Sequence, residues 1–317
     1  MKNKVAFVTG AAGFIGSSLV DRLLLEKYYV YGLDNLSKGS LKNLKLAKNN
    51  NNFEFIKGAV EDSILIRKLI KNIQPNIIFH LASGNLLTSL QDPIQDLRTT
   101  CVGVINILQS QRDYCLTSTL IHSSTGSVYG QPKYQPQDES HPLEPVSPYG
   151  ISKMAAERYI DLWSNLFGIK AVMLRYYNVY GPRQNFSTTG GVIPIFIDKA
   201  LRNQPLTIEG TGDQERCFTY VDDVVEANVK AATTPLALGE IFNIGTTEIT
   251  TIKQLADIVL KTTQSISGIS SVPRRLGDID RFQPNISKAS ETLGYTPQVF
   301  LKEGIQKTVE WFNQIDK

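Results

Sequence analysis

Short apolar runs alternate with segments of helix length over the first half of the chain. Between the first two runs, Ile15, Leu19 and Leu23 recur at four-residue spacing, which indicates one buried face of a helix. Near-continuous apolar strands separated by helices are typical of a parallel sheet covered on both faces. The pattern therefore predicts an α/β fold with a Rossmann-type, doubly wound parallel sheet. The predicted strands are residues 5–8, 29–33, 53–56, 77–81, 120–122 and 171–174.

The alternation breaks after about residue 178. Residues 193–201 predict a helix, and the tail predicts two more at about 252–261 and 301–315. Residues 216–225 and 241–244 are predicted as strands that return to the main sheet. We therefore expect a smaller C-terminal α/β lobe that binds the substrate. The predicted division assigns residues 1–177 plus about 217–247 to the domain built on the main sheet, and about 178–216 plus 248–317 to the lobe.

Composition narrows the class of partner. The chain has 317 residues, 42% of them hydrophobic, and a formal net charge of +3. These values are close to the globular average and argue against long disorder or a disulfide scaffold. The basic residues do not cluster, so no nucleic-acid partner is expected. No apolar run approaches the length of a membrane span or of a signal segment, so we expect no membrane partner.

Cysteines and histidines add little chemistry. Three scattered cysteines form no CxxC pair, which favours reduced thiols and a cytoplasmic location. The three histidines lie far apart and show no spacing typical of zinc ligands, so no metal site is expected.

The first predicted strand leads into the first predicted helix through a glycine-rich turn. Gly10, Gly13 and Gly16 are spaced as GxxGxxG, one residue wider at the start than the GxGxxG dinucleotide fingerprint. Glycines allow close backbone approach, and the following helix N-terminus attracts a pyrophosphate. Asp34 follows Gly16 by 18 residues at the end of the second predicted strand. A carboxylate there can bind a ribose 2′-hydroxyl and repel a 2′-phosphate, which favours NAD over NADP.

A second constellation lies further along the chain. Tyr149 and Lys153 are four residues apart on one predicted helix, so they share a face. A lysine cation beside a phenol favours the phenolate, and we therefore expect the Tyr149 pKa to fall below its usual value. That change makes Tyr149 a candidate general base. The fifth predicted strand ends in several hydroxyl residues, of which Thr125 or Ser124 could hold a substrate oxygen.

Taken in order, the motifs resemble those of the extended short-chain dehydrogenases/reductases, and among them the NAD-dependent nucleotide-sugar epimerases and dehydratases. The resemblance covers nearly the whole chain. It rests on residues 9–16, 33–37, 80–83, 127–130, Tyr149 with Lys153, 175–183, 218–225 and 275–278. It implies NAD as the cofactor, a UDP-sugar as the substrate and a homodimer formed through helices at about 96–111 and 149–165.

The resemblance also implies which residues bind the cofactor. The implied set is Gly10, Gly13, Phe14, Ile15, Gly16, Asp34, Asn35, Leu36, Ser37, Val60, Leu81, Ala82, Ser83, Ser123, Tyr149, Lys153 and Tyr176. Two residues depart from the family pattern on this side of the site. Ala59 replaces an aspartate near the adenine, and Thr100 replaces an asparagine near the cofactor. Ser83 and Gly84 replace a more common Ala-Gln pair near the substrate mouth.

The family implies catalysis by Thr125, Tyr149 and Lys153. Sugar 4,6-dehydratases carry an Asp-Glu pair directly after the catalytic threonine, whereas this chain has Gly126 and Ser127. Without that acid, elimination lacks its proton carrier, so the resemblance favours the UDP-glucose 4-epimerase type, which inverts C4 of a UDP-hexose through a transient 4-keto sugar. The alternatives are an epimerase for UDP-GlcNAc or UDP-glucuronate, a UDP-glucuronate decarboxylase, a 4,6-dehydratase and a noncatalytic NAD-binding regulator.

Substrate contacts are implied residue by residue. Arginines are suited to a diphosphate because the planar guanidinium makes paired, charge-assisted hydrogen bonds. A bulky Phe282 favours UDP-glucose and UDP-galactose over the N-acetylated sugars. The implied substrate set is Ser127, Asn178, Val192, Arg216, Arg275, Asp278 and Phe282.

Overall fold

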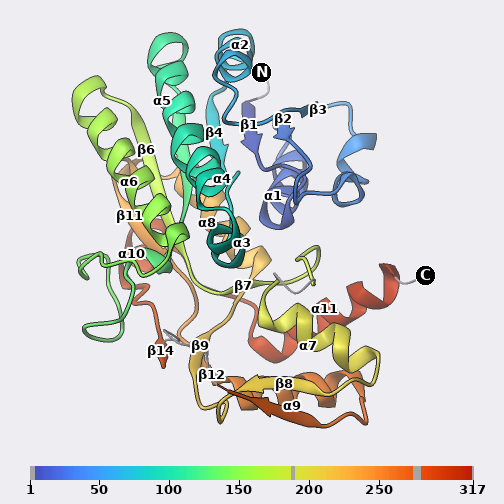
Figure 1. Ribbon diagram of the computed structural model, residues 1–317. Coiled ribbons are helices and arrows are strands. Elements are labelled where there is room, and N and C mark those ends of the chain that lie inside the picture. Colours follow the sequence, from blue (N-terminus) through green and yellow to red (C-terminus); the bar gives the residue numbers. More distant parts are fainter. Residues whose placement is uncertain (1–3, 187–189, 274–279, 316–317) are drawn as a thin grey trace.

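The computed structural model describes residues 4–186, 190–273 and 280–315. Its main feature is a seven-stranded sheet in which every neighbouring pair of strands is parallel, in the order β11-β6-β5-β4-β1-β2-β3 (Figure 1). This order reverses at β1 and is that of a doubly wound sheet. The strands are β1 (Val5–Thr9), β2 (Tyr29–Asp34), β3 (Phe53–Lys57), β4 (Ile77–His80), β5 (Thr119–Thr125), β6 (Lys170–Tyr176) and β11 (Ile241–Ile244).

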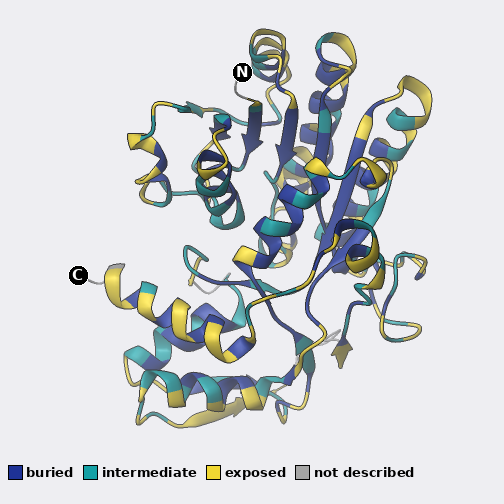
Figure 2. Ribbon diagram, turned by 180° about the vertical axis from the view of Figure 1, so that it is seen from behind, coloured by how far each residue is buried: buried dark blue, intermediate teal, exposed yellow. Residues whose placement is uncertain are grey.

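All six strands predicted in the first half are present, and the predicted fold class is confirmed. Residues alternate between the two faces of each strand, so Ala6 and Val8 of β1 pack on one side and Phe7 on the other. Strands β1, β4, β5 and β6 are buried on both faces, which accounts for their near-continuous apolar runs, whereas the edge strand β3 is partly exposed. The buried strands contrast with the exposed outer faces of the helices (Figure 2).

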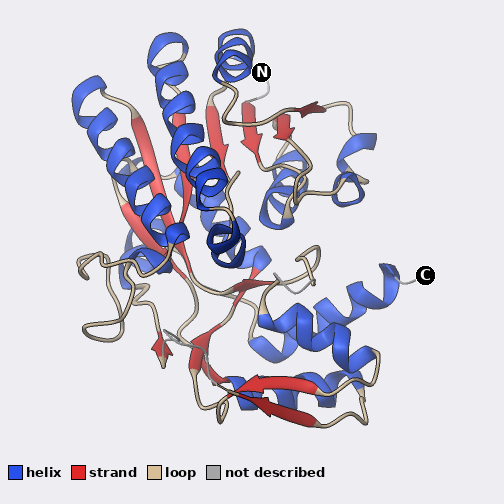
Figure 3. Ribbon diagram, viewed as in Figure 1, coloured by secondary structure: helices blue, strands red, loops and turns tan. Residues whose placement is uncertain are grey.

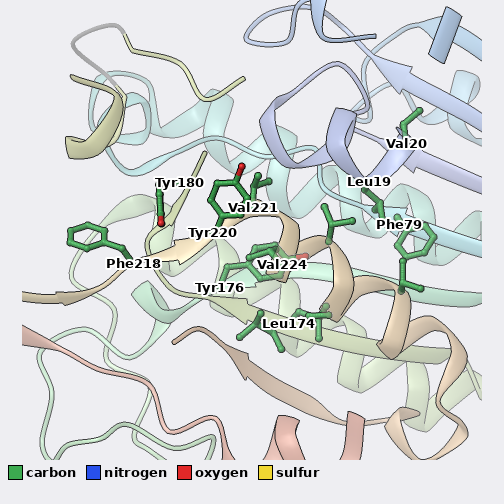
Figure 4. Close-up of a cluster of buried hydrophobic side chains, with 14 of the residues drawn as sticks. Leu19, Val20, Phe79, Leu174, Tyr176, Tyr180, Phe218, Tyr220, Val221 and Val224 are labelled. Carbon is green, nitrogen blue, oxygen red and sulfur yellow. The ribbon is translucent and has the colours of Figure 1, made fainter. Parts of the chain in front are cut away.

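Helices cover both faces of the sheet. On one face α2 (Ser63–Ile73) packs beside α5 (Gly103–Tyr114), which packs beside α6 (Pro148–Phe167). On the other face α1 (Phe14–Leu25) packs against α8 (Val221–Thr233). Leu19 and Val20 of α1 belong to the same core cluster as Val224 of α8 and as Phe79 and Leu174 of the sheet (Figure 4). The core on this side continues into the smaller lobe.

The smaller lobe lies beyond the carboxyl ends of the strands (Figure 3). Its helices are α7 (Val192–Leu201), α9 (Ile252–Thr263) and α11 (Leu301–Ile315), and α9 packs against the other two. These three helices confirm the predictions for this part of the chain. The lobe also holds a three-stranded sheet, β12-β9-β14, and two strand pairs, β13-β8 and β10-β7. The strands are β7 (Val179–Tyr180), β8 (Leu206–Glu209), β9 (Glu215–Cys217), β10 (Thr219–Tyr220), β12 (Ile249–Thr251), β13 (Ile269–Val272) and β14 (Arg281–Phe282).

Short elements complete the chain. The α-helices among them are α3 (Leu86–Gln91), α4 (Pro93–Leu97) and α10 (Ser287–Leu293), and α10 packs on β11. A π-helix, η3 (Arg98–Val102), joins α4 to α5, so the single helix predicted over 96–111 is three consecutive elements. The 3₁₀ turns are η1 (Leu41–Leu44), η2 (Ala47–Asn49), η4 (Gly126–Val128) and η5 (Pro235–Ala237).

One predicted strand is wrong. Residues 216–225 do not return to the main sheet: they form the end of β9, the strand β10 and the first turn of α8. Asp222 and Asp223 occupy the first turn of α8, where negative charge is favoured by the helix dipole. The prediction for residues 241–244 is confirmed, since β11 pairs with β6 at the edge of the sheet. The division into two domains stays a prediction.

Candidate active site

The glycine-rich turn brings three backbone segments close together. Gly10 has a φ of +69°, and a Cβ built on it would lie 2.9 Å from the backbone nitrogen of Ala82 in the loop after β4. A Cβ on Gly16 would overlap the carbonyl oxygen of Gly10. Only glycine fits these positions, and no side chain caps the N-terminus of α1, which follows the turn. Unpaired N–H groups at such a helix N-terminus suit an anion.

Asp34 lies at the end of β2, at the position predicted for a ribose ligand. Its carboxylate accepts hydrogen bonds from the backbone nitrogens of Ala12, at 2.9 Å, and Leu36, at 2.7 Å. Burial raises the pKa of Asp34, while these backbone N–H groups oppose the rise. The hydrogen bonds hold the carboxylate in place beside the glycine turn, so the residues predicted to contact opposite ends of an adenosine diphosphate lie together.

A cavity of about 590 Å³ runs from the glycine turn to α6. It is lined by every residue of the predicted cofactor set except Leu36. Asn178 of the predicted substrate set also lines it. Several polar residues that line the cavity were not predicted from the sequence: Lys38, Asn43, Glu61, Asn85, Thr99, Arg183 and Gln184. Lys38 donates a hydrogen bond to Thr88 Oγ1 at 2.7 Å.

Tyr149 and Lys153 lie at the inner end of this cavity, on the first two turns of α6. Pro148 opens the helix, and the Ser147 side chain caps it by accepting from the Gly150 nitrogen at 3.1 Å. The Ser89 hydroxyl of α3 accepts from the Tyr149 nitrogen at 3.1 Å. Sequence spacing gave no sign of this contact, because α3 is 60 residues away.

The expected fall of the Tyr149 pKa is wrong. Burial raises the pKa of Tyr149 to about 12, although hydrogen bonds with the Thr125 and Ser83 side chains oppose the rise. Lys153 Nζ lies 6.0 Å from the centre of the Tyr149 ring and donates instead to the Ser123 carbonyl oxygen at 2.6 Å. The four-residue spacing places both groups on one face, but the lysine amine is directed at the end of β5. Burial lowers the pKa of Lys153 itself to about 8.

Thr125 ends β5 beside Tyr149, and its Oγ1 donates to Ser127 Oγ at 3.2 Å. The residue between them, Gly126, packs against two aromatic rings. A Cβ on Gly126 would lie 2.7 Å from Tyr177 Cζ and 2.7 Å from Phe282 Cζ. Tyr177 is fully buried, and its ring lies 4.7 Å from that of Phe282. The rings therefore leave no room for a side chain at position 126.

The remaining predicted substrate residues come from the smaller lobe and its connections. Asn178 adopts a φ of +40° and donates to the Cys217 carbonyl oxygen at 3.1 Å. Arg216 on β9 pairs with Phe282 on β14, so the two residues are brought together. Val192 is the first residue of α7. Arg275 and Asp278 lie outside the described residues.

Beneath these groups lies an ion pair that the motifs did not reveal. Glu157 of α6 accepts from Arg175 of β6 through Nε at 2.9 Å and through Nη2 at 2.6 Å. It also accepts from the Ser124 hydroxyl at 2.5 Å, and both charged side chains are 2% exposed or less. Glu157 follows Lys153 by one helical turn, which is the one sequence signal that could have drawn attention to it.

The fold and the site define a class of protein, namely one with a dinucleotide-binding fold and a Ser/Thr, Tyr and Lys set at the carboxyl edge of its sheet. The family model described as GDP-mannose 4,6 dehydratase matches residues 7–308. The chain belongs to this family of extended short-chain dehydrogenases/reductases, which confirms the resemblance drawn from the motifs.

Individual relatives agree with this assignment. A UDP-glucose 4-epimerase of Mycolicibacterium smegmatis is 40% identical, covering 96% of this chain and 97% of its own. A UDP-glucose 4-epimerase of Thermotoga maritima, whose structure contains UDP-glucose, is 37% identical with a TM-score of 0.93, covering 99% of this chain and 100% of its own. The structure of a UDP-glucuronic acid 4-epimerase of Bacillus cereus, in complex with UDP-glucuronic acid and NAD, is 32% identical with a TM-score of 0.91. The match covers 98% of this chain and 99% of the other. No helix in the described part of the chain is long and apolar enough to cross a membrane.

Proposed function

We propose that this protein is an NAD-dependent epimerase that inverts C4 of a UDP-hexose, with UDP-glucose and UDP-galactose as its substrates. The observation that carries the proposal is the packing of Gly126 against Tyr177 and Phe282. A dehydratase needs an acidic side chain at this position, directly after the threonine, and here none fits. A keto sugar formed in this site therefore has no acid at position 126 to drive elimination, and its remaining course is to be reduced again at the same carbon.

The residues of the cavity fit NAD. The crowded Gly10 and Gly16 let a pyrophosphate approach the start of α1, and Asp34 provides the carboxylate that a ribose diol requires. When bound, NAD would supply reversible acceptance of a hydride from the sugar. The same Asp34 carboxylate disfavours a 2′-phosphate, which supports NAD over NADP.

Proton transfer falls to the residues at the inner end of the cavity. The Tyr149 phenol would take the proton of the sugar 4-hydroxyl and later return it. Thr125, hydrogen-bonded to Tyr149, would orient that hydroxyl. Lys153 would favour the phenolate by its charge and bind the cofactor ribose. Because burial, as the largest cause, raises the Tyr149 pKa to about 12, the phenolate depends on cationic charge close by.

The diphosphate of the substrate is assigned to Asn178, Arg216 and Arg275, with Asp278 three residues after Arg275 in the sequence. Ser127 and Val192 complete the proposed substrate set. The Phe282 ring packs against the Tyr177 ring at a tilt of 30° and fills space next to Gly126, which supports a hexose without an N-acetyl group. A UDP-uronate is the principal alternative, because a UDP-glucuronic acid 4-epimerase shares the fold at 32% identity.

The test is to incubate the NAD-loaded protein with UDP-galactose and follow the sugar by NMR. We expect UDP-glucose to form until equilibrium, with slower or no conversion of UDP-glucuronate and UDP-GlcNAc. Tyr149→Phe should abolish turnover while NAD stays bound. Tyr159→Phe is the matched control, since Tyr159 is on the same helix and partly exposed, and it should keep activity. Folded, NAD-loaded protein that leaves UDP-galactose unchanged refutes the proposed substrate.

We also propose that the protein is a homodimer. On α6, Ile151, Leu162 and Leu166 are 51%, 48% and 62% exposed, and on the adjacent α4, Ile94 and Leu97 are 63% and 48% exposed. Two copies related by a twofold axis could cover this face with a bundle of helices. Light scattering should give twice the mass of the chain, and Leu162→Glu should give a monomer.

The three cysteines are free and buried, which supports a reducing, cytoplasmic location.

A further inference from the structure

Asp96 on α4 is a buried acid for which the mechanism above has no use. It is 4% exposed, and within the described residues neither carboxylate oxygen has a hydrogen-bond partner. An isolated buried carboxylate is costly, and proteins retain one only where another charge or a bound group compensates it.

The Asp96 carboxylate lies directly behind the wall of the cavity. Gly84, which lines the cavity, has no room for a side chain, because a Cβ there would overlap Asp96 Oδ1. One turn further along, Thr100 Oγ1 is likewise buried without a partner among the described residues. Thr100 belongs to the π-helix η3, and such helices occur frequently at functional sites. This edge of α4 and η3 thus presents polar atoms beside the site.

The same edge of α4 and η3 also contacts α6, the helix that carries Tyr149 and Lys153. Cys101 Sγ donates to the Ser152 carbonyl oxygen of α6 at 3.1 Å, immediately before Lys153. The Asp96 charge raises the pKa of Lys38, Cys101, Tyr149 and Lys153. Since α4 packs against α6, Asp96 lies near the helix that carries the two residues assigned to proton transfer, and its charge acts on both.

Lys153 needs a counter-charge, and Asp96 is the carboxylate left to provide it. Lys153 is 1% exposed, and burial lowers its pKa, which the Asp96 charge opposes more strongly than any other charge. Glu157 also affects Lys153, but its oxygens are committed to Arg175 and Ser124. His80 and His122 lie in the same region, and burial lowers the pKa of His80 to about 3 and that of His122 well below its usual value, so both imidazoles stay neutral.

We propose that Asp96 is the buried counter-charge of Lys153, a positioning residue that keeps the lysine protonated and so acts on proton transfer at Tyr149. The proposal rests on the role of Tyr149 in the proposed function. Asp96 does not line the cavity and touches no reacting atom in this assignment. Its effect is carried by charge across the wall formed by Gly84 and the start of α6.

Removal of the charge has a definite sign. A nearby anion favours the protonated form of a lysine. Asp96→Asn should therefore lower the pKa of Lys153, and the alkaline limb of a pH–rate profile, where Lys153 loses its proton, should move to lower pH. The expected displacement is about one pH unit, the lower end of the range for a neighbouring opposite charge. A residue that only supports packing changes the height of the profile and leaves its position unchanged.

The experiment measures the ionisation of Lys153 directly, without sugar. In the NAD-loaded protein, lysines labelled with carbon-13 at Cε are titrated with pH by NMR, and the signal that is lost in Lys153→Met is assigned to Lys153. The same titration is made in the Asp96→Asn background. Asp92→Asn is the matched control: it makes the same change at the exposed N-cap of α4, where asparagine also caps. If Asp96→Asn fails to fold, Asp96→Leu supplies an apolar side chain of similar volume.

The expected result is a Lys153 transition at lower pH in Asp96→Asn or Asp96→Leu and an unchanged transition in Asp92→Asn. A Lys153 transition that stays in place in the folded Asp96 variants overturns the proposal, as does an equal displacement in Asp92→Asn. Since no sugar is present, this outcome is separate from the outcome of the epimerase assay. An inactive protein with a displaced Lys153 transition would contradict the proposed substrate and support the role of Asp96.

Discussion

The contact between Gly126 and two aromatic rings makes the reasoning on reaction type testable. Gly126→Ala adds a single methyl group at a position where the added carbon would lie 2.7 Å from Tyr177 Cζ and Phe282 Cζ. Gly126 does not have a positive φ, so the backbone accepts alanine and the whole effect comes from packing. One of the two rings or the backbone of Gly126 must therefore move.

The rings have little freedom to move. Tyr177 is fully buried between Phe282 and Tyr129, with ring centres 4.7 and 6.4 Å away, and Phe282 is 9% exposed. Overpacking of a filled site costs about 1 to 3 kcal/mol. Any movement of the backbone displaces Thr125, which immediately precedes Gly126, so turnover should fall while NAD stays bound. Denaturant unfolding measures the loss of stability, and the epimerase assay measures the fall in turnover.

The control is Gly268→Ala. A Cβ on Gly268 has no heavy atom within 4 Å and its φ is not positive, so alanine should leave stability and activity unchanged or raise stability slightly. Phe282→Ala removes one of the two rings, and in its background Gly126→Ala should cost less than it does alone. If Gly126→Ala is as stable and active as Gly268→Ala, position 126 has room for a side chain, and the argument against a dehydratase fails.

Two further predictions concern charged groups beside the site. Glu157→Gln should destabilise the protein by about 3 to 5 kcal/mol, because it leaves the buried Arg175 unpaired, and the double variant Glu157→Gln/Arg175→Met should recover part of that loss in denaturant unfolding. Burial lowers the pKa of Lys153 from 10.5 in the unfolded chain to about 8 in the folded one, so below pH 8 the folded wild type carries the full cost of a buried ammonium. That cost disappears as the pH rises to 10.5, and wild type should therefore gain stability relative to Lys153→Met between pH 7 and pH 10, by up to roughly 3 kcal/mol in denaturant unfolding. A stability difference that is the same at both pH values would contradict the buried charge.

The strands and the main helices could be predicted because their signal is local. A strand buried on both faces must be apolar throughout, and a helix on a sheet must repeat its apolar residues every three to four positions. Residues 216–225 show where this reading fails. Their β-branched and aromatic residues suit a strand, but Asp222 and Asp223 sit in the first turn of a helix, and Val221, Val224 and Val225 are buried as parts of its inner face. The choice between the two depends on what the segment packs against.

The candidate site divides in the same way. Glycine spacing and the four-residue separation of Tyr149 and Lys153 are local, and the structure brings these residues to one cavity. The direction of the Lys153 amine is not local, since it depends on the Ser123 carbonyl at the end of a strand 30 residues away. The same holds for Asp96, whose proximity to α6 follows from the packing of α4. Sequence spacing identified the reactive groups but not the charges that surround them.

The buried polar network explains how separate elements hold the catalytic groups in one arrangement. From Ser124 of β5, hydrogen bonds lead through Glu157 to Arg175, whose Nη1 donates to Tyr129 Oη at 2.8 Å. Tyr129 in turn donates to Asn243 Oδ1 of the edge strand β11 at 2.8 Å. Thr125 adjoins the first member of this chain on β5, and Lys153 lies one turn before Glu157 on α6. A change anywhere in the network therefore moves Thr125 and Lys153 together, which preserves their relation to Tyr149 better than two independent supports would.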